Sequence, residues 1–222
     1  MPSIFNTLIK LIDLIIDDKM IAMGKQGIFI CIEGLDASGK TTHAHRLVRS
    51  LLERGYMALY TTEPSSGQIG TFVRTYILQR RKRVSTVVEA LLFAVDRVDH
   101  VEETIKPAVK DGKIVVSDRY LYSSLAYQGA AGLNLNWIEE INKFALSPDL
   151  AIYIDVPPEI VVKRLKRKKS VMENLQTQRR VREVYMRLVK DGRLMLINGN
   201  RTKHEVATEV LSTVLDFLKK RS

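Results

Sequence analysis

Residues 34–41 read Gly-Leu-Asp-Ala-Ser-Gly-Lys-Thr, and they stand between an apolar run and a helical pattern. The string matches the phosphate-binding pattern G-x-x-x-x-G-K-[ST] in the strand–loop–helix context that this pattern requires. Its glycines let backbone N–H groups converge on phosphate oxygens, and the following helix adds the positive end of its dipole. The alternative, a glycine-rich turn without a ligand, does not explain this context. The segment therefore predicts an α/β fold that holds a nucleoside triphosphate.

The residues of this P-loop have expected roles. Lys40 can bridge the β- and γ-phosphates of ATP, and the hydroxyl of Thr41 can bind Mg²⁺. ATP is therefore the expected phosphoryl donor, and Mg²⁺ is the expected cofactor. The expected ATP contacts are Gly34, Leu35, Asp36, Ala37, Ser38, Gly39, Lys40, Thr41 and Thr42.

The rest of the chain alternates short apolar runs with longer helical periods. Strands are predicted at 27–33, 56–62, 113–117, 149–156 and 194–197. Helices are predicted at 40–54, 69–79, 86–109, 120–146 and 203–219. A further helix begins at Pro158, and a highly basic segment follows it. Apolar strands that alternate with helices are typical of βαβ units. We expect one domain over residues 27–222, with a five-stranded parallel sheet of the P-loop NTPase type and helices on both faces.

Residues 1–26 form a separate extension with apolar side chains at helical spacing, interrupted by Lys10 and Asp13. This run is too short and too charged to span a bilayer, which takes about 20 apolar residues. It also lacks the basic opening and small-residue cleavage site of a signal peptide. We expect an amphipathic helix that docks on the body or on a partner subunit. A membrane-surface helix is the alternative, although its polar face is not basic. Met20 and Met23 are also plausible starts of the chain.

The net charge is +10, from 35 Lys and Arg against 25 Asp and Glu. Such an excess is compatible with nucleic acid, with an anionic membrane or with small polyanions such as nucleotides. The basic residues concentrate between Lys163 and Arg187. The single cysteine, Cys31, excludes an intramolecular disulfide and fits the reducing cytoplasm.

Several motifs follow the P-loop in a specific order and spacing. They are Glu63-Pro64, Leu91-Leu92-Phe93-Ala94-Val95-Asp96-Arg97, Asp118-Arg119-Tyr120, Ser123-Ser124, Ala126-Tyr127-Gln128-Gly129, Pro148-Asp149-Leu150 and Asp155-Val156-Pro157-Pro158. Together with Glu33-Gly34-Leu35-Asp36, they resemble the thymidylate kinase family from about residue 27 to the C-terminus. No motif beyond the P-loop is decisive alone, but their combination is specific. The resemblance implies transfer of the ATP γ-phosphate to dTMP, which gives ADP and dTDP.

Phe93 and Arg97 are four residues apart and share one face of a helix. An aromatic ring can stack on a base, worth about 1–3 kcal/mol, and a guanidinium beside it can donate to a base carbonyl. The alternative is that Phe93 lies in the core and Arg97 is a surface charge. The resemblance implies that Phe93 stacks on thymine and that Arg97 binds its O4.

Asp118 and Arg119 follow a strand at its carboxyl end, where ligands of open α/β sheets collect. Asp118 can hold the hydration shell of Mg²⁺, and Arg119 can pair with a monophosphate. The resemblance implies that Arg119 clamps the acceptor phosphate, that Tyr127 limits the room for a ribose 2′-hydroxyl, and that Asp36 accepts from the sugar 3′-hydroxyl. Arg74 is a second candidate for the phosphate, with a solvated helix charge as the alternative. The expected dTMP contacts are Asp36, Glu63, Arg74, Phe93, Arg97, Arg119, Ser124, Tyr127 and Gln128.

The basic segment 163–175 resembles the family's mobile lid. Phosphoryl transfer leaves little covalent work to the protein, so cationic charge supplies much of the catalysis. Ala37 stands where some family members carry an arginine, and lid arginines are therefore expected to supply that charge. A solvated basic helix face is the alternative. The expected catalytic residues are Asp36, Lys40, Arg119, Arg164 and Arg167.

Two other functions compete with this one. The first is a kinase for another nucleoside monophosphate or a deoxynucleoside, and the second is a P-loop protein whose basic segment grips nucleic acid. Phe93, Arg97 and the Tyr127-Gln128 pair favour dTMP, because a nucleic-acid motor has no need for a closed base pocket. The expected partners are ATP and dTMP, without nucleic acid or membrane, and family members are typically homodimers. The histidines do not suggest a metal site, because His43 and His45 face different ways on one helix.

Overall fold

The computed structural model describes residues 27–79, 84–165 and 174–221. The expected amphipathic extension, residues 1–26, lies outside the described residues. So does Arg167, with the rest of residues 166–173 in the middle of the expected lid.

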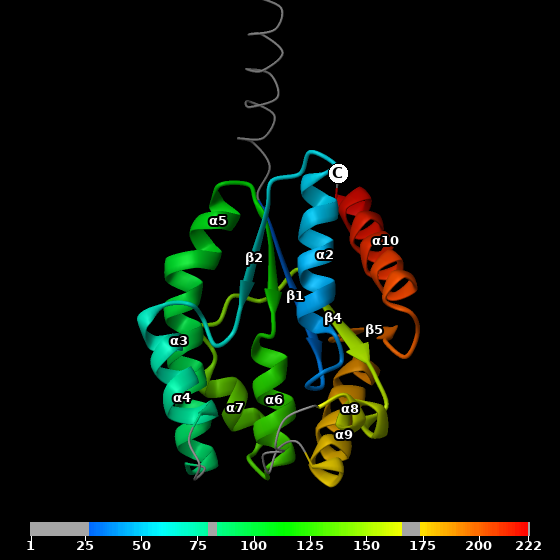
Figure 1. The fold of residues 1–222 in the computed structure, drawn as a ribbon. Helices are drawn as coiled ribbons and strands as arrows, with labels where there is room; N and C mark the ends of the chain where they lie inside the picture. The colour runs from blue at the N-terminus through cyan, green and yellow to red at the C-terminus, as the bar shows by residue number, and fades with distance from the viewer. Residues whose placement is uncertain (1–26, 80–83, 166–173, 222) are drawn as a thin grey trace, which may run out of the picture.

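A wholly parallel, five-stranded sheet forms the centre of the fold (Figure 1). Its strands are β1 (Ile28–Gly34), β2 (Ala58–Thr62), β3 (Ile114–Asp118), β4 (Leu150–Asp155) and β5 (Met195–Asn198). They lie in the order β2-β3-β1-β4-β5. The three inner strands are continuous apolar runs because helices bury both of their faces, whereas the edge strands β2 and β5 are partly exposed. The expected five-stranded parallel α/β sheet is confirmed.

Helices cover both faces of the sheet. They are α2 (Lys40–Leu52), α3 (Gln68–Val73), η1 (Arg74–Leu78), α4 (Thr86–His100), η2 (Val101–Ile105), α5 (Lys106–Lys110), α6 (Leu121–Ala130), α7 (Leu135–Ile141), α8 (Pro158–Arg164), α9 (Leu175–Lys190) and α10 (Lys203–Arg221). The chain runs outward from β1 to β2 and then returns across the sheet. Right-handed crossovers place the helices of these two directions on opposite faces. Accordingly α2 and α10 pack together on one face, and α5, α6 and α9 contact β3, β1 and β4 on the other.

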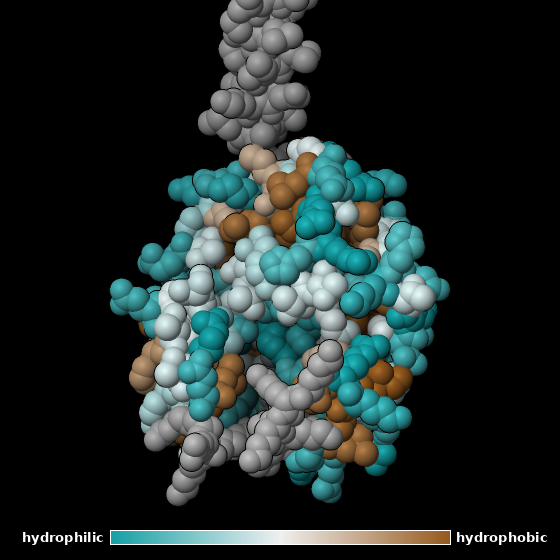
Figure 2. Space-filling model, viewed as in Figure 1, coloured by the Kyte–Doolittle hydropathy of each residue, from teal (hydrophilic) through white to brown (hydrophobic). Residues whose placement is uncertain are grey.

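The two directions of the chain separate at β1, so the carboxyl ends of β1 and β3 border a crevice. Ile32 of β1 is in register with Asp118 of β3, which places the P-loop beside the Asp118-Arg119 turn. In Figure 2 the molecule is hollowed at this edge, and the floor of the hollow is hydrophilic. The fold thus brings both expected halves of the site to one place.

Three helical segments differ from the sequence-based expectation. The helix at 86–110 widens into a π-helical turn at Val101–Ile105, just before Pro107, which lacks the N–H of a regular turn. The region 120–146 is divided into α6 and α7 at Gly132, whose φ is +101°, and Asn134 then caps α7. Helix α9 was not predicted at all. No described helix is long and apolar enough to cross a membrane.

Candidate active site

The P-loop connects β1 to α2 through a backbone that only certain residues can adopt. Gly39 has a φ of +102° and begins α2 without a side-chain cap, so the first N–H groups of the helix face the loop. A Cβ on Gly34 would lie 2.6 Å from Oγ of Ser38 and 2.8 Å from the carbonyl oxygen of Ile154. Both glycines of the motif are therefore required by geometry, and the loop concentrates N–H donors suited to an anion.

Lys40 lies inside this loop with only 5% of its side chain exposed. Its Nζ donates to the carbonyl oxygen of Leu35 over 2.7 Å. Burial, together with the positive charge of nearby Arg119, lowers the pKa of Lys40 to about 8. The hydroxyl of Ser38 is buried as well and has no hydrogen-bond partner among the described residues. Buried donors that lack acceptors suit a bound phosphate, whose oxygens satisfy them.

Thr41 of α2 and Asp118 of β3 form the part of the site that could hold a metal ion. Oγ1 of Thr41 donates to Oδ2 of Asp118 over 2.5 Å. Oδ1 of Asp118 is buried and has no hydrogen-bond partner within the described part of the chain. A hydroxyl and a carboxylate are hard oxygen ligands of the kind that Mg²⁺ takes, together with water and substrate phosphates. The described residues contain no cluster of three or more His, Cys, Asp or Glu that would form a protein-only metal cage.

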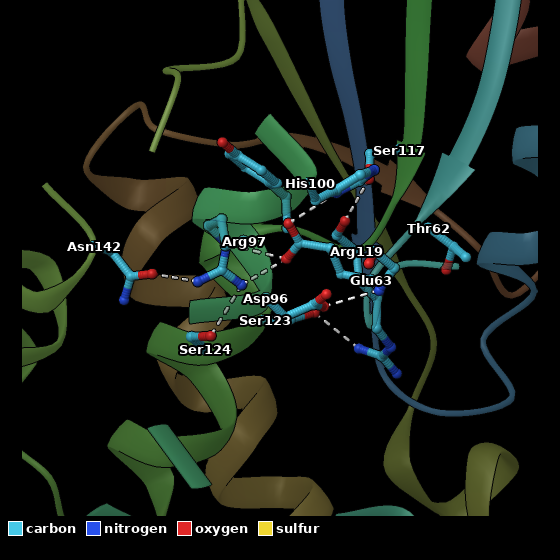
Figure 3. A network of polar contacts seen from close by, with 12 residues as sticks. Thr62, Glu63, Asp96, Arg97, His100, Ser117, Arg119, Ser123, Ser124 and Asn142 are labelled. Atoms are coloured by element: carbon cyan, nitrogen blue, oxygen red, sulfur yellow. Dashed lines mark hydrogen bonds and ion pairs between the residues drawn. The ribbon is translucent and has the colours of Figure 1, made fainter. Parts of the chain in front are cut away.

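Arg119 occupies a constrained position after β3. Its φ is +73°, in the left-handed region, which costs a non-glycine residue about 1–3 kcal/mol. Its N–H donates to the carbonyl oxygen of Ile32 over 3.0 Å, and its own carbonyl accepts from Oγ of Ser117 over 2.7 Å (Figure 3). The surrounding backbone therefore holds this residue in a conformation that it would not adopt alone.

The guanidinium of Arg119 joins two other expected site residues. It forms an ion pair with Asp36 in the P-loop, and it lies over the ring of Tyr127 at 5.2 Å from the centroid. The Tyr127 hydroxyl accepts from the N–H of Asp36 over 3.1 Å. Burial alone would raise the pKa of Asp36, but the charges of Arg119 and Lys40 hold that pKa below its ordinary value. Asp36 is therefore an anion whose charge is balanced by the guanidinium of Arg119.

Arg97 of α4 is buried, with 2% of its surface exposed, so the surface-charge alternative is wrong. It donates from Nε and Nη2 to Oε2 of Glu63 over 3.0 and 2.7 Å. Nη1 donates to Oδ1 of Asn142 over 2.5 Å, and Nη2 donates to Oγ of Ser124 over 3.1 Å (Figure 3). These contacts among described residues use four of the five N–H donors of a guanidinium, which leaves one on Nη1. Phe93, one turn earlier, is half-buried and lies outside the apolar core.

Gln128 and Arg74 complete the expected acceptor residues. Gln128 is buried between α6 and α4, where its Nε2 donates to Glu89 over 2.8 Å. Its Oε1 has no hydrogen-bond partner among the described residues. Arg74 is half-buried and donates from Nη2 to the carbonyl oxygens of Pro64 and Ser65, over 2.6 and 3.2 Å. The solvated-charge alternative for Arg74 is therefore wrong, because this side chain holds the loop after β2.

A family model described as thymidylate kinase matches residues 32–210, which include every expected site residue. The chain belongs to the thymidylate kinase family. A relative from Pyrococcus abyssi is 41% identical over 197 residues, and one from Pyrococcus horikoshii is 39% identical over 197; each alignment covers 85% of this chain and 96% of the relative. A relative from Caldivirga maquilingensis is 39% identical over 196 residues, covering 86% and 95%. All three are named probable thymidylate kinase.

Of the two expected lid arginines, Arg164 lies within the described residues and Arg167 lies outside them. Arg164 is exposed at the end of α8, and its Nη1 lies 3.5 Å from the carbonyl oxygen of Ala37 in the P-loop, at the limit of a hydrogen bond. Arg182 of the following helix α9 makes two bonds of 2.7 Å to Asp155 at the end of β4. Arg164 thus places the start of the lid segment next to the P-loop, and Arg182 joins α9, which follows the lid segment, to the end of β4.

Asp96 and Asn142 contact residues of the site but were not predicted as site residues. Asp96 accepts from the N–H of Ser65 over 2.8 Å and so fixes the loop after β2. It belongs to a motif that carried the resemblance, so its sequence signal was present. Asn142 contacts Arg97 from the end of α7, and no sequence pattern marks it. Its role depends on how α7 packs, which local sequence does not specify.

Proposed function

We propose that residues 27–222 form a thymidylate kinase domain that transfers the γ-phosphate of ATP to dTMP and gives ADP and dTDP. The observation that carries this proposal is that the P-loop and the cluster of Asp36, Arg119 and Tyr127 meet at the carboxyl ends of β1 and β3. A donor site and an anion-binding acceptor site are thus adjacent. Family membership and the names of the relatives support the choice of dTMP.

On the donor side, the P-loop N–H groups and Lys40 bind the β- and γ-phosphates of ATP. Thr41 and Asp118 would hold Mg²⁺, and this assignment is supported by Oδ1 of Asp118, which has no hydrogen-bond partner among the described residues. A bound Mg²⁺ would supply positive charge that offsets the charge of the phosphate groups. The acceptor is already an anionic phosphate oxygen, so the protein needs to supply position and positive charge rather than a strong base. Arg164 adds charge from the lid side, which its approach to Ala37 supports; for Arg167 the same role stays a prediction.

On the acceptor side, Arg119 pairs with the phosphate of dTMP, Asp36 accepts from the sugar 3′-hydroxyl, and Tyr127 packs against the sugar. Phe93 stacks on the thymine ring. Arg97 donates its remaining Nη1–H to the thymine O4. A guanidinium has donors but no acceptor, so the exocyclic amino group of cytosine would face it unfavourably. This accounts for selection of thymine over cytosine.

Four further residues build the walls of this pocket. Glu63 and Ser124 fix the guanidinium of Arg97. Arg74 holds the loop that carries Glu63. Gln128 lines the α4–α6 side, and its buried Oε1, which has no hydrogen-bond partner among the described residues, could accept from a ligand.

Phe93→Ala tests the base pocket. The variant should raise the KM for dTMP by about fivefold to a hundredfold, because a base–aromatic stack contributes about 1–3 kcal/mol. The KM for ATP should stay within about twofold, since Phe93 lies on α4 and the P-loop on β1 and α2. The measurement is a coupled ADP-release assay with either nucleotide varied.

Phe144→Ala is the matched control, because Phe144 is an exposed ring in the loop before β4 and none of the contacts described for the site involves it. It should leave both KM values unchanged. If Phe93→Ala raises the KM values for ATP and for dTMP equally, Phe93 is a packing residue and the thymine pocket lies elsewhere.

We also propose that the protein is a homodimer that packs through α4. Val88, Leu91 and Val95 follow one outward face of this helix, and each is more than 40% exposed. Phe72 on the adjacent α3 is exposed too. Contiguous exposed apolar side chains mark an interaction surface, and a second copy is the expected occupant because family members are typically dimers.

Leu91→Asp should convert the dimer to a monomer in sedimentation velocity, because it would place two carboxylates in an apolar contact. Leu196→Asp changes an equally exposed leucine on the edge strand β5 and should leave the dimer intact. A monomeric wild type, or a dimer that persists in Leu91→Asp, would contradict this assignment.

The proposed location is the cytoplasm, where the single, buried thiol of Cys31 stays reduced.

A further inference from the structure

Glu33 is a charged residue that the proposed reaction does not use. It is the last residue but one of β1, directly before the P-loop, and none of its surface is exposed. Burial raises the pKa of Glu33, while hydrogen bonds from Ser123 and Tyr185 and the charge of Arg119 oppose that rise. A fully buried carboxylate is costly unless its oxygens are satisfied. Its position beside both halves of the site therefore requires an explanation.

Four donors surround this carboxylate. Oε1 accepts from the backbone N–H groups of Tyr120 and Ser123, over 2.9 and 3.2 Å. Oε2 accepts from the hydroxyls of Ser123 and Tyr185, over 2.6 and 2.9 Å. Tyr120 and Ser123 begin α6, which has no side-chain cap of its own residues. Glu33 thus caps α6 from a different strand, and a carboxylate at a helix N-terminus is also favoured by the dipole.

The hydroxyl of Ser123 connects Glu33 to Arg119. A serine hydroxyl has one proton and two lone pairs. Ser123 donates this proton to the carboxylate of Glu33 in a hydrogen bond of 2.6 Å. The hydroxyl oxygen of Ser123 therefore presents its lone pairs to its other neighbours. Nη1 of Arg119 donates to it over 2.8 Å. The carboxylate of Glu33 therefore fixes the orientation of the Ser123 hydroxyl, so that its oxygen accepts a hydrogen bond from the guanidinium of Arg119.

Arg119 has few other constraints on that side of its guanidinium. Asp36 binds Nη2 from the P-loop, and the Tyr127 ring lies against the plane. The contact of Nη1 with the carbonyl oxygen of Gly34 is long, at 3.4 Å. The Ser123 hydroxyl is thus the close partner of Nη1, and its loss would free that end of the side chain.

We propose that Glu33 is a positioning residue for the acceptor phosphate: by fixing the proton of Ser123, it holds Arg119 in the orientation that receives dTMP. This inference rests on the proposed function, in which Arg119 contacts that phosphate. Glu33 itself touches neither substrate. Its effect should appear on the acceptor side and spare the donor side, although it stands next to the P-loop in sequence.

The test compares Glu33→Gln and Ser123→Ala with the wild type in steady-state kinetics. Each variant should lower kcat/KM for dTMP by about tenfold to a hundredfold, the loss that misplacement of a positioning group produces. The KM for ATP should stay within about twofold. The double variant should be no worse than the worse single variant, because both changes break one connection. If the double variant instead shows the product of the two single losses in kcat/KM, the proposal is wrong.

Tyr185→Phe is the matched control. It removes one hydrogen bond from the same carboxylate and the 3.1 Å contact between the hydroxyls of Tyr185 and Ser123. It keeps the stacking of Tyr185 on Tyr153 and leaves the contact of Ser123 with Arg119 in place. The kcat/KM of Tyr185→Phe for dTMP should stay much closer to the wild-type value than that of Ser123→Ala. Glu33 is a packing residue only if Tyr185→Phe lowers kcat/KM for dTMP as much as Ser123→Ala does. The same conclusion follows if the variants weaken the use of ATP and of dTMP equally. Should Glu33→Gln fail to fold, Ser123→Ala decides alone, because Glu33 then keeps three of its donors.

The outcome separates this inference from the proposed function. If Arg119→Ala impairs dTMP turnover while Ser123→Ala and Glu33→Gln behave as the wild type, the function stands and the positioning role fails. If Arg119→Ala leaves dTMP kinetics unchanged, the proposed function itself fails.

Discussion

Arg119→Ala should lower kcat/KM for dTMP by about a thousandfold, because a charge-assisted contact to a reacting phosphate is expected to contribute about 4 kcal/mol in a water-excluded site. The ion pair with Asp36 and the left-handed backbone hold this guanidinium beside the P-loop. Arg119→Lys should recover little, because an ammonium reproduces neither the fork geometry nor the contact with the Tyr127 ring. Steady-state kinetics with dTMP varied at saturating ATP measures this effect.

The KM for ATP and the melting temperature provide the controls for Arg119→Ala. Loss of the positive charge leaves Asp36 without its partner, so a small change in stability is expected, whereas the change in dTMP turnover should be far larger. A variant that loses stability but keeps its kcat/KM for dTMP would remove Arg119 from the acceptor site.

Arg97→Met should lower the free energy of unfolding by about 3–5 kcal/mol, the usual cost of leaving one partner of a buried ion pair uncompensated. Methionine has a similar volume but leaves Oε2 of Glu63 without its two bonds and Asn142 without its donor. Urea unfolding gives the change directly. In a domain of this size the melting temperature should fall by about 6–20 °C.

Two comparisons make the Arg97 prediction specific. Arg193→Met breaks the exposed pair between Arg193 and Glu139 and should cost less than about 1 kcal/mol. Adding Glu63→Gln to Arg97→Met should restore part of the loss, because the unpaired buried charge is then removed. Equal costs for Arg97→Met and Arg193→Met would mean that the buried pair does not hold α4 to the end of β2.

The sequence was sufficient to predict the elements whose signal is local. The P-loop pattern, the apolar strands and their alternation with helices determined the parallel sheet and the place of the donor site. Asp36, Arg119 and Tyr127 lie in separate motifs, and the sheet order brings them together as expected from strand ends that share one edge. Their convergence depends on topology, which the βαβ pattern specifies.

What was not predicted depends on contacts between distant elements. The buried apolar residues of helix α9 recur at helical spacing, namely Val181, Val184, Tyr185 and Leu188. The many arginines between them make this spacing hard to distinguish from a basic loop in the sequence. Asn142 belongs to no sequence motif, and Glu33 belongs to a motif of the resemblance but had no predicted role. Each acquires its role only when a neighbouring helix presents a partner. The burial of Arg97 also required the structure, because helical spacing alone equally permits a surface charge.

The central claim is that this chain phosphorylates dTMP, and product analysis tests it most directly. The wild-type protein is incubated with ATP, Mg²⁺ and one of dTMP, dUMP, dCMP, dGMP or AMP, and the nucleotides are separated and quantified. We expect ADP and dTDP to form in equal amounts, and dTMP to be used much faster than dCMP, dGMP or AMP. Equal rates with dTMP and AMP, or ADP released without dTDP, would contradict the account.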